Sequence, residues 1–191
     1  MSIDIVFIVA IGVGTSLTML VLFVVMIALC YRTVGPDKAL IRGGLGGMQA
    51  RTGSAGGLWV IPMLHSVDVM DITVKRLLIE LKGSQGLLCR DGTRIDCEAE
   101  FHLRIGVYSR DILEVAEAIG CQRAANLETL RELFDRKFTD ALRQTASPFD
   151  ANDLVTYTEY ERYLSHVLDS IGGDLNGYQL DDAAIAFLGP N

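Results

Sequence analysis

The chain has 191 residues, which is enough for a membrane anchor and one or two small domains. Its formal net charge is −7 at pH 7 and it has no run of lysines and arginines, which argues against a nucleic-acid partner, because phosphate binding needs a basic face. The four cysteines match no zinc, redox or haem spacing, and scattered thiols fit a reducing compartment. They are Cys30, Cys89, Cys97 and Cys121.

The first long feature is an apolar segment. Residues 5–31 contain no Asp, Glu, Lys, Arg, His, Asn, Gln or Pro. As a helix the segment would reach about 40 Å, against a hydrocarbon core of about 30 Å. Its start has no basic residue and its apolar core is too long for a cleaved signal peptide. We therefore predict an uncleaved membrane anchor that includes Ile5, Leu20 and Tyr31.

The bases that flank this segment predict its orientation. None precedes the segment, whereas Arg32, Lys38, Arg42 and Arg51 follow it. The positive-inside rule then places the N-terminus outside and everything after the anchor in the cytoplasm.

Short strands separated by glycine are expected next. Residues 39–41 are strand-like, and the glycine clusters at 43–47 and 53–57 lack the Gly-Lys-Ser/Thr ending of a phosphate loop, so they indicate turns. Residues 58–64 are apolar on both faces, which leaves two interpretations open: a core strand, or a segment pressed on the bilayer. In the second interpretation the membrane-surface contacts are Trp59, Ile61, Met63 and Leu64.

The clearest pattern is a long alternating strand. Residues 66–82 read as extended with a bend near Asp71, and an Asp-Gly turn follows at residues 90–93. From Ile95 to Val107 the odd positions are apolar, while the even positions from 94 to 104 are charged or histidine. Period two predicts one dry and one wet face, with Cys97 in the core.

Three amphipathic helices and a last strand complete the pattern. The helices are expected at residues 110–119, 127–144 and 160–171, and the strand at residues 179–188. Ser109 and Asn126 are the expected caps of the first two helices, and Gly172 ends the third. All of these elements follow the predicted transmembrane helix along the chain.

No pattern for catalysis is present. His65, His102 and His166 are isolated, and no nucleophile motif, His-Glu-x-x-His, Walker or dinucleotide pattern occurs. Asp68 and Asp71 read as exposed turn acids without a basic partner. We predict no catalytic residue, no metal ligand and no cofactor.

Several segments together resemble the SPFH (band 7) family, and most closely its flotillin branch. They are Pro-Asp-Lys-Ala-Leu-Ile at 36–41, Gly-Gly-Leu-Trp-Val-Ile-Pro at 56–62, Val-Asp-Val at 67–69, Arg-Asp-Gly-Thr at 90–93 and Asp-Leu-Asn-Gly-Tyr-Gln-Leu at 174–180. The resemblance spans residues 33–188. It implies the fold class α+β: an N-terminal transmembrane helix is followed by an SPFH-like domain in which a curved antiparallel sheet packs with helices on the cytoplasmic leaflet.

The resemblance also implies a role without enzymatic activity. Family members form homo-oligomers, organise membrane microdomains and, in bacteria, work with NfeD-like membrane proteins. We accordingly expect a single-pass inner-membrane protein with an anchor at 1–32, an SPFH-like domain at 33–188 and a tail at 189–191. Flotillins continue into a charged coiled coil, and these residues contain no sustained heptad, so the sequence is either a short member or a piece of a longer chain.

Two functions remain open at this point. The first is a membrane scaffold that oligomerises on the cytoplasmic leaflet. The alternative is a membrane-tethered adaptor that regulates a membrane protease or another membrane complex. Both would use the same fold, and they differ in size: a ring or large array for a scaffold, a small complex for an adaptor.

Overall fold

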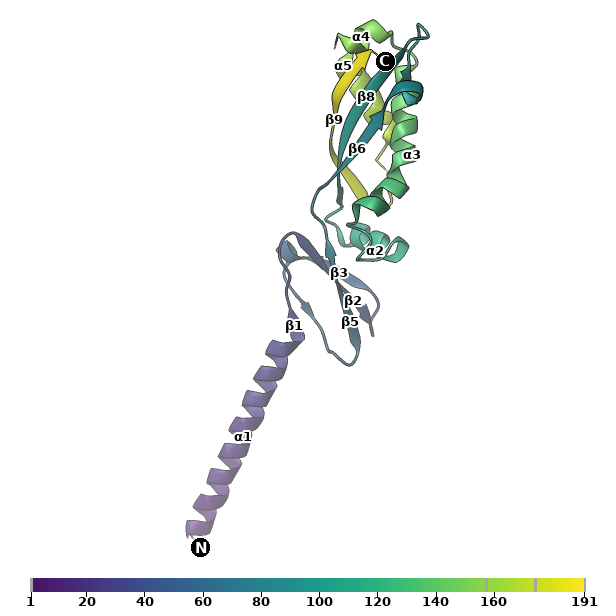
Figure 1. Cartoon of the computed structure of the whole chain (residues 1–191). Helices are drawn as coiled ribbons and strands as arrows, with labels where there is room; N and C mark the ends of the chain where they lie inside the picture. The colour runs from purple at the N-terminus through teal and green to yellow at the C-terminus, as the bar shows by residue number, and fades with distance from the viewer. Residues whose placement is uncertain (1, 157, 174, 191) are drawn as a thin grey trace.

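The chain forms a long helix, a small β subdomain and a larger α+β subdomain, which follow one another along an elongated molecule (Figure 1). The computed structural model describes residues 2–156, 158–173 and 175–190. Helix α1 spans Ser2–Cys30, and its stretch Ile11–Cys30 is long and apolar enough to cross a membrane. The helix contains Ile5 and Leu20 but ends one residue before Tyr31, the third residue named for the predicted anchor.

Tyr31 is instead the first residue of strand β1 (Tyr31–Arg32), which pairs with β4 (Leu58–Trp59). Its ring packs edge-on against Trp59 with 5.6 Å between centroids, and its hydroxyl accepts a hydrogen bond from the Gly57 amide. The apolar run in the sequence continues through Tyr31, but it does not show that Tyr31 pairs with a distant strand and so leaves the helix. The β1–β4 pair, called the ribbon below, therefore begins directly where the helix stops.

The β subdomain also contains a three-stranded antiparallel sheet in the order β3-β2-β5. Its strands are β2 (Lys38–Gly44), β3 (Gln49–Thr52) and β5 (His65–Asp71), with a short 3-10 turn at Gly53–Ala55. One face of this sheet joins the main core through Ala39, Ile41, Ala50 and Met70. The opposite face carries Leu40, which is buried. Leu58 of the ribbon and Val60, which follows it, are also buried.

A second antiparallel sheet organises the larger subdomain around β8. Its strands are β6 (Lys75–Leu81), β7 (Leu87–Leu88), β8 (Arg94–Ile105) and β9 (Tyr178–Pro190), with a 3-10 turn at Gly83–Gln85. Strands β6 and β7 pair with β8, and so does β9. The β8–β9 register shifts twice, and such bulges bend a sheet, in keeping with the predicted curvature.

The alternation predicted for the long strand is confirmed in β8. Its odd residues are buried and its even residues from 96 to 104 are half-buried, with Cys97 fully enclosed. Burial raises the pKa of the Cys97 thiol to about 12, so this cysteine behaves as a core side chain. The strand ends at Ile105, however, and Val107 is exposed, so the prediction of a dry-face Val107 is wrong.

Helices cover one face of the second sheet (Figure 1). They are α2 (Ser109–Ala118), α3 (Leu127–Ala146), α4 (Ala151–Val155) and α5 (Tyr160–Ile171). The cap at Asn126 is confirmed, because its side chain accepts a hydrogen bond from the Glu128 amide. The cap at Ser109 is wrong: its hydroxyl donates to the Ala50 carbonyl and so ties α2 to the β subdomain.

Aromatic side chains fill the space between sheet and helices. Phe101 of β8 lies 4.5 Å from Phe138 of α3, measured between ring centroids, and Phe134 packs edge-on against Tyr178. The hydroxyl of buried Tyr163 donates to the Leu142 carbonyl, so this buried hydroxyl has a hydrogen-bond partner. The α+β architecture with an N-terminal helix is the one expected, and β9 continues past residue 188 to Pro190.

Asp71 organises the link between the two subdomains. Its carboxylate accepts hydrogen bonds from the Thr73 amide at 2.8 Å and the Thr73 hydroxyl at 2.6 Å, and Lys75 lies 2.8 Å away. The sequence prediction of an acid without a basic partner is therefore wrong. Partial burial alone would raise the pKa of Asp71, but the bonds from Lys75 and Thr73 lower it from 3.8 to about 2.

This shift predicts a defined pH dependence of stability. A carboxyl with a depressed folded-state pKa stabilises the fold above its unfolded pKa and loses that contribution as the pH falls through about 2. We expect the urea midpoint of Asp71→Asn, followed by circular dichroism in detergent micelles, to lie below wild type at pH 5 and to converge with it towards pH 2. The control is Asp68→Asn on the same strand, since the Asp68 side chain makes no hydrogen bond or ion pair in the described part of the chain. A gap between Asp71→Asn and wild type that is constant from pH 5 to pH 2 would contradict this role.

Candidate membrane-contact site

The described residues contain no cluster of His, Cys, Asp and Glu that could hold a metal ion. The three histidines lie on separate elements: His65 on β5, His102 on β8 and His166 on α5. His102 lies on the wet face of its strand, as predicted, and His166 is exposed. The histidine positions therefore provide no shared catalytic site.

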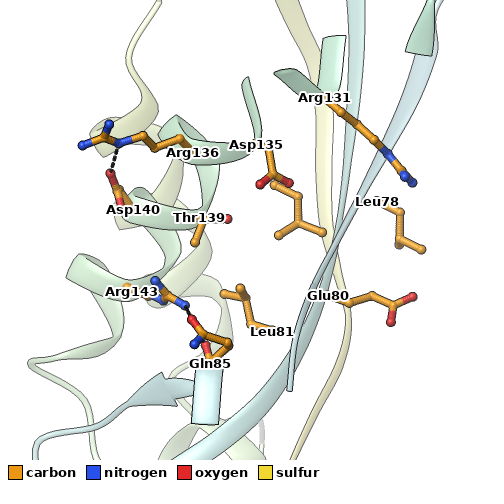
Figure 2. Close-up of a pocket in the computed structure, with 11 residues that line it drawn as sticks. Leu78, Glu80, Leu81, Gln85, Arg131, Asp135, Arg136, Thr139, Asp140 and Arg143 are labelled. Carbon is orange, nitrogen blue, oxygen red and sulfur yellow. Dashed lines mark hydrogen bonds and ion pairs between the residues drawn. The ribbon is translucent and has the colours of Figure 1, made fainter. Parts of the chain in front are cut away.

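A hollow of about 580 Å³ forms a groove between α3 and strand β6 (Figure 2). Charged side chains of both signs line it: Glu80, Arg131, Asp135, Arg136, Asp140 and Arg143. Figure 2 shows Arg136 directed at Asp140 and Arg143 at Gln85, and these pairs lie 3.7 Å and 2.6 Å apart. No histidine or cysteine is among the lining residues, so the groove presents carboxylate and guanidinium groups.

A different surface carries the apolar side chains that the sequence singled out. Two loops of the β subdomain meet there: the β2–β3 turn and the turn before β5. The Leu45 amide donates to the Leu64 carbonyl at 3.3 Å. Gly44 allows this approach, because it has φ +119° and a Cβ there would lie 2.3 Å from the Leu64 oxygen.

His65 also holds these two loops together. Its Nδ1 accepts a hydrogen bond from the Ile61 amide at 3.1 Å, so Nε2 carries the proton and donates to the Leu45 carbonyl at 3.1 Å. One side chain therefore fixes both turns, and sequence reasoning, which treated His65 as isolated, missed this role.

Six large apolar side chains that are exposed on the two loops and on β4 are called the tip surface below. Met63 is 94% exposed, and the other five lie between 43% and 71%. The six are Leu45, Met48, Trp59, Ile61, Met63 and Leu64. The core interpretation is thus right for Leu58 and Val60 and wrong for the four residues named in the alternative. Strand pairing turns Leu58 and Trp59 of β4 to opposite faces, and Ile61, Met63 and Leu64 belong to the exposed turn before β5. Leu45 and Met48 were not predicted, although apolar residues inside a glycine-rich turn are a usable signal.

Short bonds fix the tip surface beside the end of α1. The Val60 amide donates to the carbonyl of Cys30, the last residue of the helix, at 2.7 Å. Arg42 of β2 donates to the Trp59 carbonyl at 2.8 Å, which joins the ribbon to the sheet. In Figure 1 the lower loops of the β subdomain reach the level of the end of α1.

Charge also differs between the β subdomain and the larger subdomain. Residues 31–74 contain four basic and three acidic residues, whereas residues 75–191 contain 13 basic and 20 acidic residues. An anionic leaflet therefore repels the larger subdomain and does not repel the β subdomain.

The bridging role of His65 predicts faster local opening when its side chain is removed. In His65→Ala the Ile61 amide loses its acceptor, and a hydrogen bond of about 0.5–1.5 kcal/mol corresponds to hydrogen exchange faster by about two- to tenfold. Hydrogen exchange of the full chain in micelles measures this, with amides of β8 unaffected. His166→Ala, on α5, is the matched control; unchanged protection of Ile61 in His65→Ala would show that the ring does not hold the loops.

Comparison with known proteins agrees with this architecture. Residues 32–186 match the model of the SPFH domain / Band 7 family. The chain is 29% identical over 169 residues to the flotillin family inner membrane protein YqiK of Escherichia coli (strain K12), an alignment that covers 86% of this chain and 30% of the relative. The chain thus spans under a third of that relative's length. With a family match over most of its residues and the α+β fold after an apolar helix, the chain belongs to the SPFH domain / Band 7 family.

Proposed function

We propose that this protein is a non-enzymatic scaffold that oligomerises on the cytoplasmic leaflet of the inner membrane and organises membrane microdomains. The observation that carries the proposal is the tip surface, which is apolar, exposed and bonded to the end of a helix able to cross a membrane. Membership of the SPFH family supports a scaffold role at a membrane, and the similar YqiK is named an inner membrane protein. The bases that follow the helix favour a cytoplasmic position for the domain.

The tip surface would rest in the interfacial layer of the bilayer. Trp59 and Tyr31 are residue types that favour this layer, and their rings, packed edge-on, lie where the chain leaves the helix. Full burial of a large apolar side chain contributes about 1.5–3 kcal/mol, so even partial insertion of Met63, Leu64 and Ile61 would hold the domain against the leaflet.

Liposome flotation of a fragment containing residues 32–191 tests this contact apart from the helix. We expect the fragment to float with anionic vesicles, and Met63→Ser with Leu64→Ser to weaken its partitioning about tenfold or more, since both side chains lose apolar area. The matched control is Leu133→Ser with Leu168→Ser, two exposed leucines on α3 and α5. Equal flotation of the tip variant and the control variant would refute the contact.

Self-association would use the sides of the larger subdomain. Strand β6 pairs with β8 alone among the described strands, so its other edge is open, and the charged groove of Figure 2 runs along it. Chains anchored in one membrane share an orientation, and their upright sheets present this edge sideways (Figure 1). Paired charges on an open edge suit a specific contact better than uncontrolled strand addition.

The mass of the full chain in mild detergent separates scaffold from adaptor. Light scattering should give a particle of many copies, and Arg131→Glu with Arg136→Glu in the groove should reduce its mass. Arg110→Glu with Arg123→Glu, outside the groove, is the control for the same change in charge. A monomer, or a small complex with a membrane protease or an NfeD-like protein, would instead support a tethered regulatory adaptor.

A further inference from the structure

A second hollow, of about 410 Å³, lies between the ribbon and strand β5, and we call it the ribbon groove. Its lining is Arg32, Thr33, Val34, Leu40, Val60, Pro62, His65, Val67 and Val69. Leu40 and Val60 are buried and form its floor, while Val67 and Val69 are partly exposed. Leu40 stands opposite Val69 in the β2–β5 register, so both side chains lie on the same face of the sheet.

The polar groups of the groove are few and lie at its rim. Both nitrogens of His65 are engaged with the loops, so the ring offers the groove mainly carbon. No acidic residue lines the hollow. Arg32 is exposed, and in the described part of the chain no hydrogen bond or ion pair engages its side chain. An apolar trough with one free guanidinium at its edge is complementary to an acyl chain that bears an anionic head group.

The position of the groove decides which amphiphile can reach it. Arg32 follows the last helical residue by two positions, and the bond from the Val60 amide to the Cys30 carbonyl fixes the ribbon at the helix end. With the tip surface in the interfacial layer, the groove opens at the depth where phosphates and the first methylenes of the leaflet lie. A lipid of the same leaflet is therefore the nearest ligand of matching chemistry.

We infer that the ribbon groove holds one phospholipid of the cytoplasmic leaflet, with an acyl chain along Val67 and Val69 and the phosphate beside Arg32. This inference rests on the proposed membrane contact, because the groove must lie at head-group depth. The bound lipid would fill the space between ribbon and sheet and so become part of the surface that the domain presents to the membrane.

Native mass spectrometry of the full chain, released from detergent micelles that contain phosphatidylglycerol, tests the inference. We expect one phospholipid retained per chain, and at least a tenfold loss of retention in Val69→Asp, which puts a carboxylate in the trough. The matched control is Val74→Asp: Val74 is 48% exposed, against 46% for Val69, and lies outside the groove. Retention of detergent alone, or equal retention by the two variants, would overturn the site.

Two further variants keep the test decisive. Arg32→Gln removes the head-group partner and should lower phosphatidylglycerol retention about tenfold, as expected for one hydrogen bond to a charged group. This variant decides the matter if circular dichroism shows that Val69→Asp has unfolded, and unchanged retention in Arg32→Gln would contradict the phosphate position. In the full chain, Met63→Ser should leave phospholipid retention in micelles unchanged, whereas in the 32–191 fragment it should weaken vesicle flotation. Failure of the groove and failure of the tip contact are therefore distinguishable.

Discussion

The hydrogen bond from the Val60 amide to the Cys30 carbonyl is the contact from which the arrangement near the membrane follows. The end of a helix leaves carbonyl groups without partners, and here Val60, the residue directly after β4, supplies one of the donors. Strand β4 itself places Trp59 against Tyr31, and Val60 lines the ribbon groove. The β subdomain is thereby held close to the helix end, and it does not hang from a flexible linker.

This constraint turns a stretch with apolar residues on both faces into two surfaces with different roles. Leu58 and Val60 face inward, whereas Trp59, Ile61, Met63 and Leu64 face outward. The outward group would be an aggregation hazard in water, and in the proposed membrane contact the bilayer would cover it. In the proposed arrangement the acidic excess beyond residue 74 would repel anionic lipid and so hold the larger subdomain, with its charged groove, away from the membrane.

The elements that could be predicted from sequence are those with a long internal period. Strand β8, helix α3 with its Asn126 cap and helix α5 each repeat their pattern over ten or more residues, so local information was sufficient. The ribbon and the role of Ser109 depend on distant partners: Tyr31 pairs with Trp59, and Ser109 bonds to Ala50. The candidate site was predicted in part, because the four apolar residues were named as one alternative. Leu45 and the bridging His65 were missed, since loop contacts leave no periodic trace.

Trp59 is the one tryptophan of the chain and half-exposed on the tip surface, so its fluorescence tests the central claim most directly. The measurement is emission from the full chain in vesicles, with lipids brominated at different depths as quenchers. An indole in the interfacial layer should emit to the blue of a solvated one and be quenched most by bromines close to the head groups. Emission typical of water, unchanged by brominated lipid at any depth, would show that the helix alone meets the bilayer and that the tip surface serves another partner.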